Sequence, residues 1–257
     1  LLIYMKLDCV LSAVNDNPVY VEFVPFFIDA WNKLYPKVHI IVILVMTEIP
    51  SILEKYKENL ILFSPISSVN TSFISQYVRL LYPCILNYKN GIMITDIDMI
   101  PMNRVYYTQH IETIDSNKFI YFRGNECMNV KQLAMCYNVA TAETWRNIFN
   151  IKSIHDIQTR LSTVYKTSNY VLYRTGWFTD QVDLYTYVMQ WNTTTGNLVR
   201  LYDKDTAFNR LDRGRKFDIH SETIKENIQN GAYTDYHCLR PFNEYKNINY
   251  QIYELLQ

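Results

Sequence analysis

The sequence has few glycines, no paired cysteine motif and no excess of one charge. Only six of its 257 residues are glycine, and none forms a glycine-rich phosphate loop after the first predicted strand. The sequence therefore does not support a dinucleotide-dependent oxidoreductase. The 25 basic and 25 acidic residues balance. Because no global field would attract nucleic acid or anionic lipid, binding partners must be read from local sites.

The cysteines and the apolar runs restrict the compartment and the topology. The five cysteines are scattered, odd in number and without CxxC spacing, which favours free thiols in a reducing, cytoplasmic compartment. No apolar run approaches the ~18 residues that a membrane-spanning helix needs. The first residue is leucine rather than methionine, which is consistent with a fragment of a longer protein from which a signal or anchor was removed.

The hydrophobic pattern predicts an α/β fold. In the first part of the chain, strands are expected at residues 7–13, 39–46, 59–63 and 92–94. Helices are expected at residues 20–34, 49–56 and 71–86, the last one interrupted near Pro83. This alternation is typical of a mostly parallel central sheet flanked by helices on both sides. In the second part, strands are expected at residues 118–122 and 133–139, and helices at residues 142–149 and 180–191. No linker or repeat interrupts the pattern, so residues 1–257 are predicted to form one domain.

Residues 91–102, GIMITDIDMIPM, carry the most informative pattern. A turn and a short apolar run predict a buried strand that ends just before Asp96 and Asp98. Burying charge is costly, so acids in this position usually meet water, a metal or a positive ligand. Residues two apart on an extended chain point to the same side. Asp96 and Asp98 are therefore predicted to converge on a divalent cation, which would neutralise a diphosphate.

Two predicted loops fall at the edge of the sheet where ligands bind. In open α/β sheets, that edge lies outside the carboxyl ends of the strands. Asn15 and Asp16 follow the first predicted strand, and the two acids follow the fourth. Asn15 and Asp16 are candidates for base or ribose contacts, although a turn-forming role explains them equally well.

Residues 75–101, SQYVRLLYPCILNYKNGIMITDIDMIP, resemble the core of the GT-A glycosyltransferases, closest to the glycogenin-like enzymes. That core has a helix with a basic residue, a later proline, an apolar strand and an Asp-x-Asp motif. Three further segments support the likeness: LAMCYNVA at residues 133–140, WFTDQVD at 177–183 and YHCLRPF at 236–242. The resemblance implies a GT-A, Rossmann-like fold, with a nucleotide-binding half at residues 1–102 and an acceptor-binding half at residues 103–257.

The resemblance also implies roles for residues around the Asp-x-Asp motif. Asp98 would bind the metal most directly, with help from Asp96, which in the family often meets the ribose. Arg79 and Gln76, on the preceding helix, would contact the nucleotide-sugar donor. The segment at residues 236–242 is similar to the family's late His-x-x-Gly-x-x-Lys-Pro-Trp element, which makes His237 a metal ligand and Arg240 a phosphate contact. This segment departs from the family pattern, because it lacks the glycine and has a shorter spacing. His220 is the competing ligand candidate.

Asp180 and Asp183 are the catalytic candidates, because their segment resembles the one that opens a helix beside the transferred sugar. In an inverting enzyme, a carboxylate there would be the general base for the acceptor hydroxyl. In a retaining enzyme, it would stabilise an oxocarbenium-like centre. The sequence does not choose between Asp180 and Asp183, and Trp177 is a candidate sugar-stacking platform.

The function that the resemblance implies is sugar transfer from a nucleoside-diphosphate sugar, a UDP-sugar foremost, to a hydroxyl of a glycan, protein or small-molecule acceptor. The implied cofactor is Mn2+ or Mg2+. One alternative is a haloacid-dehalogenase-type phosphatase, because Asp96-x-Asp98-x-Ile100 superficially matches its nucleophile motif. Another is a non-catalytic sugar-binding module of the same fold. The basic segment at residues 210–216, RLDRGRK, is either a loop that faces phosphates or a solvated surface loop.

Overall fold

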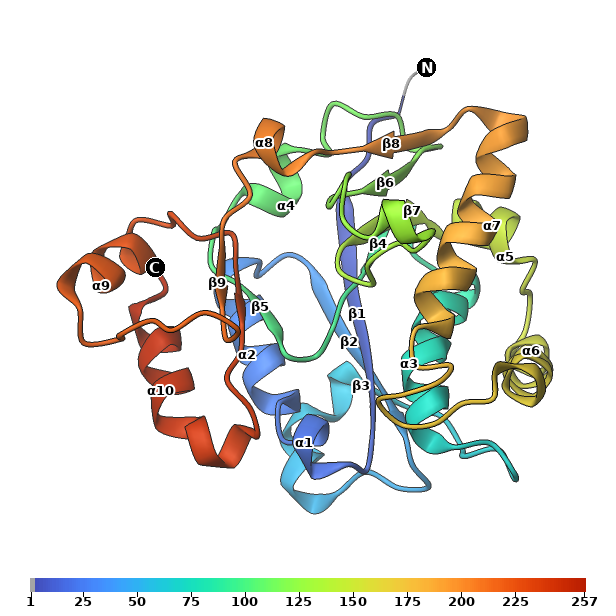
Figure 1. Ribbon diagram of the computed structural model, residues 1–257, viewed down its shortest axis with the longest axis horizontal. Coiled ribbons are helices and arrows are strands. Elements are labelled where there is room, and N and C mark those ends of the chain that lie inside the picture. Colours follow the sequence, from blue (N-terminus) through green and yellow to red (C-terminus); the bar gives the residue numbers. More distant parts are fainter. Residues whose placement is uncertain (1–2) are drawn as a thin grey trace.

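The computed structural model describes residues 3–257, and within them a seven-stranded sheet forms the centre of the molecule (Figure 1). Its strand order is β3-β2-β1-β4-β7-β6-β8. The strands are β1 (Leu7–Asn15), β2 (His39–Val45), β3 (Leu60–Leu62), β4 (Gly91–Ile94), β6 (Phe119–Tyr121), β7 (Asn138–Thr141) and β8 (Leu198–Arg200). The first four are parallel to one another, and β7 alone runs antiparallel to its neighbours β4 and β6. The predicted mostly parallel sheet is confirmed.

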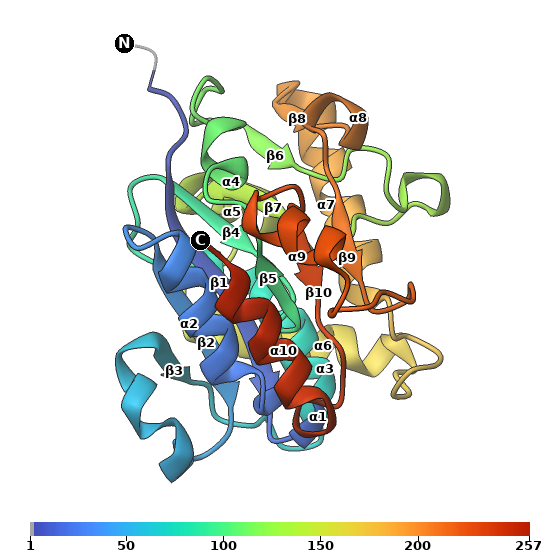
Figure 2. The same ribbon diagram turned by 90° about the vertical axis from the view of Figure 1, so that its left-hand side faces the viewer.

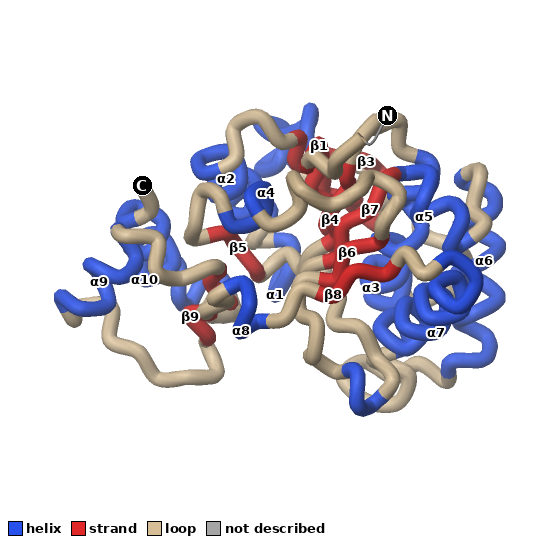
Figure 3. Tube along the Cα trace, turned by 90° about the horizontal axis from the view of Figure 1, so that it is seen from above, coloured by secondary structure: helices blue, strands red, loops and turns tan. Residues whose placement is uncertain are grey.

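Helices cover both faces of this sheet (Figures 1 and 3). One face carries α1 (Pro18–Val21), α2 (Val24–Leu34) and α10 (Phe242–Leu255), and the other carries α3 (Thr71–Leu81), α5 (Ala142–Phe149), α6 (Ile154–Ser168) and α7 (Thr179–Thr195). Successive residues of β1 point to opposite faces, so Val10 packs into one core and Leu11 into the other. Because both faces of β1 are buried, its sequence is apolar almost throughout.

A smaller sheet of three strands, in the order β5-β10-β9, lies beside α9 (Glu222–Gln229) and α10 (Figure 2). Its strands are β5 (Met99–Pro101), β9 (Arg210–Asp212) and β10 (Asp235–His237). β10 pairs with β5 antiparallel, with His237 opposite Met99. The backbone N–H of Cys238 also donates to the carbonyl of Asp98 at 2.9 Å. The late part of the chain is therefore held in register against the Asp-x-Asp segment.

Several short elements complete the described part of the chain. They are the helices α4 (Tyr106–Gln109) and α8 (Asp203–Thr206) and the 3-10 helices η1 (Ser51–Asn59), η2 (Tyr82–Ile85) and η3 (Met128–Val130). All five cysteines are free thiols. Among residues 3–257, no helix combines the length and the apolar character that a bilayer crossing requires.

Prolines divide two of the predicted helices. The helix expected over residues 20–34 is two helices, α1 and α2, because Pro25 has no N–H with which to continue a preceding helix and instead lies in the first turn of a new one. The interruption expected near Pro83 in the helix over residues 71–86 is confirmed, since α3 ends at Leu81 and Pro83 lies in the 3-10 helix η2. The segment expected as a helix over residues 49–56 is the 3-10 helix η1.

The strand expected over residues 133–139 is wrong for most of its length. The sheet begins only at Asn138, whose side-chain amide donates to the carbonyls of Ala134 and Met135 at 2.8 and 3.1 Å. These bonds close a turn, so the apolar residues there are buried without pairing as a strand. The long helix α6 and the small sheet were not predicted. The helix predicted over residues 142–149 is α5 with the same ends, and the other predicted elements are present with shifted ends. The described residues form a single domain around the central sheet.

Candidate functional site

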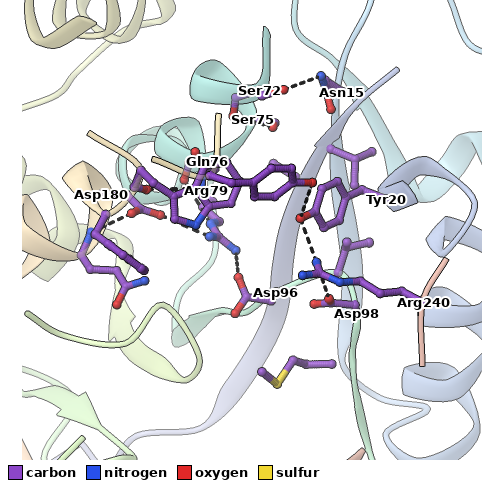
Figure 4. Close-up of a pocket in the computed structure, with 18 of the residues that line it drawn as sticks. Asn15, Tyr20, Ser72, Ser75, Gln76, Arg79, Asp96, Asp98, Asp180 and Arg240 are labelled. Carbon is purple, nitrogen blue, oxygen red and sulfur yellow. Dashed lines mark hydrogen bonds and ion pairs between the residues drawn. The ribbon is translucent and has the colours of Figure 1, made fainter. Parts of the chain in front are cut away.

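A cleft of about 350 Å3 opens at the carboxyl ends of β1 and β4, the edge predicted to bind ligands (Figure 4). Its walls come from the end of β1, from α3, from the segment after β4, from the start of α7 and from the late part of the chain. The structure brings eight of the predicted site residues together in its lining: Asn15, Gln76, Arg79, Asp96, Asp98, Asp180, His237 and Arg240.

Arg79, Asp96 and Asp180 form an inner cluster at one side of the cleft. Arg79 is only 7% exposed, and its guanidinium pairs with Asp96 through Nη1 and with Asp180 through Nη2, the latter at 3.3 Å. Its Nε also donates to the carbonyl of Gln76 at 3.1 Å. Burial lowers the pKa of Arg79, but the two carboxylates raise it above its ordinary value. The inner cluster therefore keeps a buried cation between two acids, as buried charges require.

Asp180 is poised to exchange a proton near neutral pH. Burial raises its pKa to about 6, with Arg79 opposing the rise and Asp96 adding to it. One carboxylate oxygen, Oδ1, accepts the N–H of Gln181 at 2.9 Å, while Oδ2 faces Arg79. A carboxylate with this pKa can accept a proton from a hydroxyl or stabilise a positive centre.

Asp98, Arg213, His237 and Arg240 form an outer cluster on the opposite side. Three groups approach Asp98 Oδ2: Arg213 Nη1 at 2.6 Å, Arg240 Nη1 at 3.5 Å and His237 Nε2 at 3.8 Å. Burial raises the pKa of Asp98, but Arg213, His237 and Arg240 together bring it below its ordinary value. Asp98 is therefore a carboxylate at neutral pH, although it is only 5% exposed.

His237 presents one ring nitrogen to Asp98 and the other to a second acid. Its Nδ1 lies 3.2 Å from Asp212 Oδ1. Burial lowers the pKa of His237, an effect that Asp98 opposes and Arg213 reinforces. The neutral ring then donates from Nδ1 to Asp212 and leaves the Nε2 lone pair facing Asp98. A carboxylate that orients a neutral histidine in this way is the usual arrangement behind a metal ligand.

A divalent cation fits between Asp98 and His237. The 3.8 Å between Asp98 Oδ2 and His237 Nε2 is a separation that two ligands of one ion, each ~2.1 Å from it, can have. Among the described residues that line the cleft, three arginines balance three aspartates. A diphosphate would add negative charge, which a divalent cation would offset. No three His, Cys, Asp or Glu side chains of residues 3–257 gather into a metal site, so the diphosphate would have to complete the ligands.

The edge of the cleft beside β1 is lined by hydroxyl, amide and aromatic groups (Figure 4). Asn15 donates from Nδ2 to Thr71 Oγ1 and Ser72 Oγ, both at 3.1 Å. Tyr20 accepts a hydrogen bond from Arg240 at 2.8 Å, and its hydroxyl lies 3.3 Å from that of Tyr173. These aromatic residues connect the edge of β1 with the segment that precedes α7.

The segment that precedes α7 also contributes two closely packed, tilted aromatic rings and a further polar contact. The rings of Tyr173 and Trp177 are 4.6 Å apart between centroids. Gln76 Oε1 accepts from Tyr170 at 2.9 Å. Gln76 Nε2 also donates to the carbonyl of Trp177 at 3.5 Å, so Gln76 and the predicted stacking candidate Trp177 are neighbours in the lining of the cleft.

Three candidates from the sequence are not among the residues that line the cleft. Asp16 is exposed just beyond β1. Asp183 lies one turn after Asp180 on α7, and its Oδ2 accepts from Tyr77 of α3 at 2.5 Å, between the two helices. His220 is exposed in the loop before α9. Their positions give them no direct part in a reaction in this cleft.

Sequence reasoning did not single out Arg213 within the basic segment at residues 210–216. The structure separates the members of that segment: Arg213 lines the cleft, Arg210 pairs with the buried Asp235 at 2.6 Å, and Arg215 is exposed. The basic composition of residues 210–216 was the available signal in the sequence. Which of its arginines faces Asp98 depends on the pairing of β9 with β10. Tyr20, Tyr173 and Gln181 also line the cleft without having been predicted as site residues.

No family model matches the chain, and no curated protein matches it significantly. Solved glycosyltransferase structures do match it. GlyE of Streptococcus pneumoniae is 12% identical, with a TM-score of 0.52 over 96% of this chain and 60% of GlyE. The galactosyltransferase LgtC, solved with donor and acceptor sugar analogues, is 10% identical, with a TM-score of 0.49 over 97% of this chain and 96% of LgtC. A glycosyltransferase involved in glycosylation of the major capsid of PBCV-1 is 9% identical, with a TM-score of 0.44 over 95% and 99%.

The likeness to GlyE establishes the fold. The chain spans 60% of the length of GlyE and has the GT-A-like fold of a glycosyltransferase, as the resemblance in the sequence implied. Function at this level of identity has to be argued from the site, since one fold serves many reactions.

Proposed function

We propose that the chain is a metal-dependent glycosyltransferase, which moves a sugar from a nucleoside-diphosphate sugar to an acceptor hydroxyl. One observation carries the proposal: Asp98 and His237 converge with Arg213 and Arg240 at the carboxyl edge of the sheet. This combination of a paired oxygen and nitrogen ligand with guanidinium groups suits a diphosphate that leaves with developing negative charge. A UDP-sugar is the donor that we propose.

The outer cluster would bind and stabilise the departing diphosphate. Asp98 and His237 would hold Mn2+ or Mg2+, which when bound supplies Lewis-acid stabilisation of the diphosphate without proton transfer. Arg240 lies at the mouth of the same side, with 33% of its side chain exposed and Nη1 bonded to Tyr20. Its guanidinium can turn to a phosphate oxygen and form a charge-assisted bond there.

The inner cluster would position the donor and the reacting sugar. The buried guanidinium of Arg79 pairs with the carboxylates of Asp96 and Asp180 and also donates to the carbonyl of Thr95 at 3.3 Å. Asp96 keeps 30% of its side chain exposed toward the cleft, where it can accept a hydrogen bond from a ribose hydroxyl. Asn15, at the end of β1, is placed for a further contact with the nucleoside.

Asp180 would act at the sugar. With a pKa raised to about 6 by burial, it can take the acceptor proton in an inverting reaction or stabilise an oxocarbenium-like centre in a retaining one. Tyr173, Trp177 and Phe178 line the adjacent wall and offer aromatic faces to a glycan, protein or small-molecule acceptor. Positioning of the acceptor there would lower the barrier by removing its translational freedom before reaction.

A panel of sugar nucleotides tests the proposal. Release of nucleoside diphosphate is measured with Mn2+ and with EDTA, in the presence and absence of candidate acceptors. We expect slow donor hydrolysis or transfer that requires Mn2+ and is lost in Asp98→Ala, while Asp16→Ala, exposed and outside the cleft, retains it.

Other outcomes support the alternatives. Phosphate release from simple monoesters would favour the phosphatase, which requires Asp96 as a free nucleophile, whereas here Arg79 engages that carboxylate. Donor binding with no turnover under any acceptor would favour the sugar-binding module.

A further inference from the structure

Arg213 occupies the atom of Asp98 that the proposed cation needs. Its Nη1 lies 2.6 Å from Asp98 Oδ2, the same oxygen that faces His237 Nε2 at 3.8 Å. An ion held by both Asp98 and His237 would sit within a few ångströms of this guanidinium. Two positive charges at that distance repel each other, the more so in a site from which water is largely excluded. Arg213 and the cation therefore compete for one carboxylate.

The surroundings of Arg213 allow its side chain to leave. The residue follows directly after β9, and its backbone N–H is fixed by the carbonyl of His237 at 3.1 Å. Besides Asp98, its guanidinium donates to the carbonyl of Cys238 at 3.1 Å. The side chain of Arg213 is 19% exposed, and the next two residues in the chain, Gly214 and Arg215, are exposed. Its backbone is thus anchored, while part of its side chain remains accessible to water.

We propose that Arg213 is an exchangeable counter-ion, which neutralises Asp98 in the free chain and moves to the donor's diphosphate when the cation binds. The inference rests on the proposed function and deepens it by adding a donor-binding residue. A guanidinium binds a phosphate through two parallel hydrogen bonds, so the diphosphate can replace the carboxylate of Asp98 as the partner of Arg213. The exchange frees Asp98 Oδ2 for the cation without leaving either charge unpaired.

Coupled binding of metal and donor follows from this exchange. Mn2+ alone must displace Arg213 from Asp98 with no other anion to receive it, so it binds weakly. A bound diphosphate removes that competitor, and by linkage the metal raises the affinity for the diphosphate by the same factor. The chain would thereby hold the metal chiefly when a donor is present.

The test is a titration of Mn2+ followed by electron paramagnetic resonance of the free ion, with and without UDP. It uses the full chain, Arg213→Gln and the control Arg215→Gln, which removes an equal charge two residues away on the surface. We expect Arg213→Gln to bind Mn2+ about tenfold more tightly without UDP, and the factor by which UDP strengthens Mn2+ binding to fall. Arg215→Gln should match the unchanged chain in both measurements.

Equal or weaker Mn2+ binding by Arg213→Gln without UDP would overturn the exchange. Thermal unfolding verifies that each variant is folded, and Arg213→Lys provides a second variant whose ammonium cannot make the bidentate contact. We expect it to lower the factor by which UDP strengthens Mn2+ binding, and an undiminished factor would also overturn the exchange. If UDP binds equally in EDTA and Mn2+ binds none of the proteins, the proposed metal dependence fails as well. If the unchanged chain binds Mn2+ tightly without UDP, only the exchange fails.

Discussion

The two clusters of the cleft use the same chemistry, carboxylates paired with arginine, in different surroundings. In the inner cluster, the side chain of Arg79 is 9% exposed and lies between Asp96 and Asp180. In the outer cluster, the side chains of Arg213 and Arg240 are 19% and 33% exposed and share Asp98. One arginine thus holds two acids in the first case, and two arginines converge on one acid in the second.

This difference separates the tasks of the two acids in the Asp-x-Asp motif. A buried ion pair is costly to break, because the remaining charge has no water to receive it. A partly exposed pair exchanges partners readily, since water and a ligand can replace the lost contact. We therefore propose that the buried Arg79 keeps Asp96 in place, whereas Asp98, shared by two partly exposed arginines, exchanges partners when a ligand binds.

The largest expected effect is on stability, in the inner cluster. Arg79→Met leaves the buried Asp180 and the half-buried Asp96 without their cation, so we expect the free energy of unfolding to fall by about 3 kcal/mol. Arg240→Met, in the outer cluster, should cost less than ~1 kcal/mol. Urea denaturation near neutral pH compares the two. Equal losses would remove the distinction between the clusters.

The next effect is on activity, in the outer cluster. Asp98→Asn keeps the size of the side chain but removes the charge that would hold the cation. We expect metal-dependent release of nucleoside diphosphate to fall about a thousandfold, equivalent to ~4 kcal/mol. Circular dichroism and thermal unfolding show whether the variant remains folded. If Asp98→Asn is folded and keeps its full Mn2+-dependent activity, Asp98 is not the ligand of the cation.

The inner cluster should also give a pH signature. Burial raises the pKa of Asp180 from 3.8 to about 6, so the folded state holds this proton more tightly than the unfolded state. The resulting stability is fully present below the unfolded pKa and is lost as pH rises through the folded one. Relative to Asp180→Asn, the protein should lose up to about 3 kcal/mol between about pH 4 and about pH 7.

Denaturant titrations of both proteins across this range measure that difference. The comparison with Asp180→Asn cancels the contributions of other acids, such as Asp98, whose lowered pKa acts in the opposite direction. If the difference in free energy of unfolding between the protein and Asp180→Asn does not vary with pH, Asp180 does not titrate in this range.

The smallest effect concerns Asp183, which lies outside both clusters. Its carboxylate accepts a hydrogen bond from Tyr77 between α3 and α7. Asp183→Asn should cost about 1 kcal/mol of stability and leave sugar transfer within about twofold. Asp180→Asn, assayed in parallel, should lose at least about tenfold in transfer. If both variants lose transfer activity to a similar extent, Asp183 takes part in the reaction.

The sequence predicted the inner part of the site better than the outer part. Asp96, of the inner cluster, follows a short buried strand whose apolar residues are continuous, and Arg79 lies on a strongly periodic helix just before it. These signals are local in the chain. The pairing of Arg213 with Asp98 spans 115 residues and depends on strands of only three residues, which are too short to show a periodic pattern.

The choice between Asp180 and Asp183 shows the same limit. Both lie on the first two turns of α7 and differ by less than one turn, so helical periodicity does not separate them. The neighbours of α7 decide the matter, since Arg79 engages one carboxylate and Tyr77 engages the other. Which residue of α3 meets which acid is a property of helix packing.

The pairing of β10 with β5 sets the order in which the cleft is completed during synthesis. Every strand of the large sheet and every member of the inner cluster precede Arg213, His237 and Arg240 in the chain. A nascent or proteolytically shortened chain could therefore hold Arg79, Asp96 and Asp180 in place while Asp98 still lacked its partners. Such a chain would resemble the finished protein in its large sheet and yet lack Arg213, His237 and Arg240, the groups that we propose to act on a diphosphate.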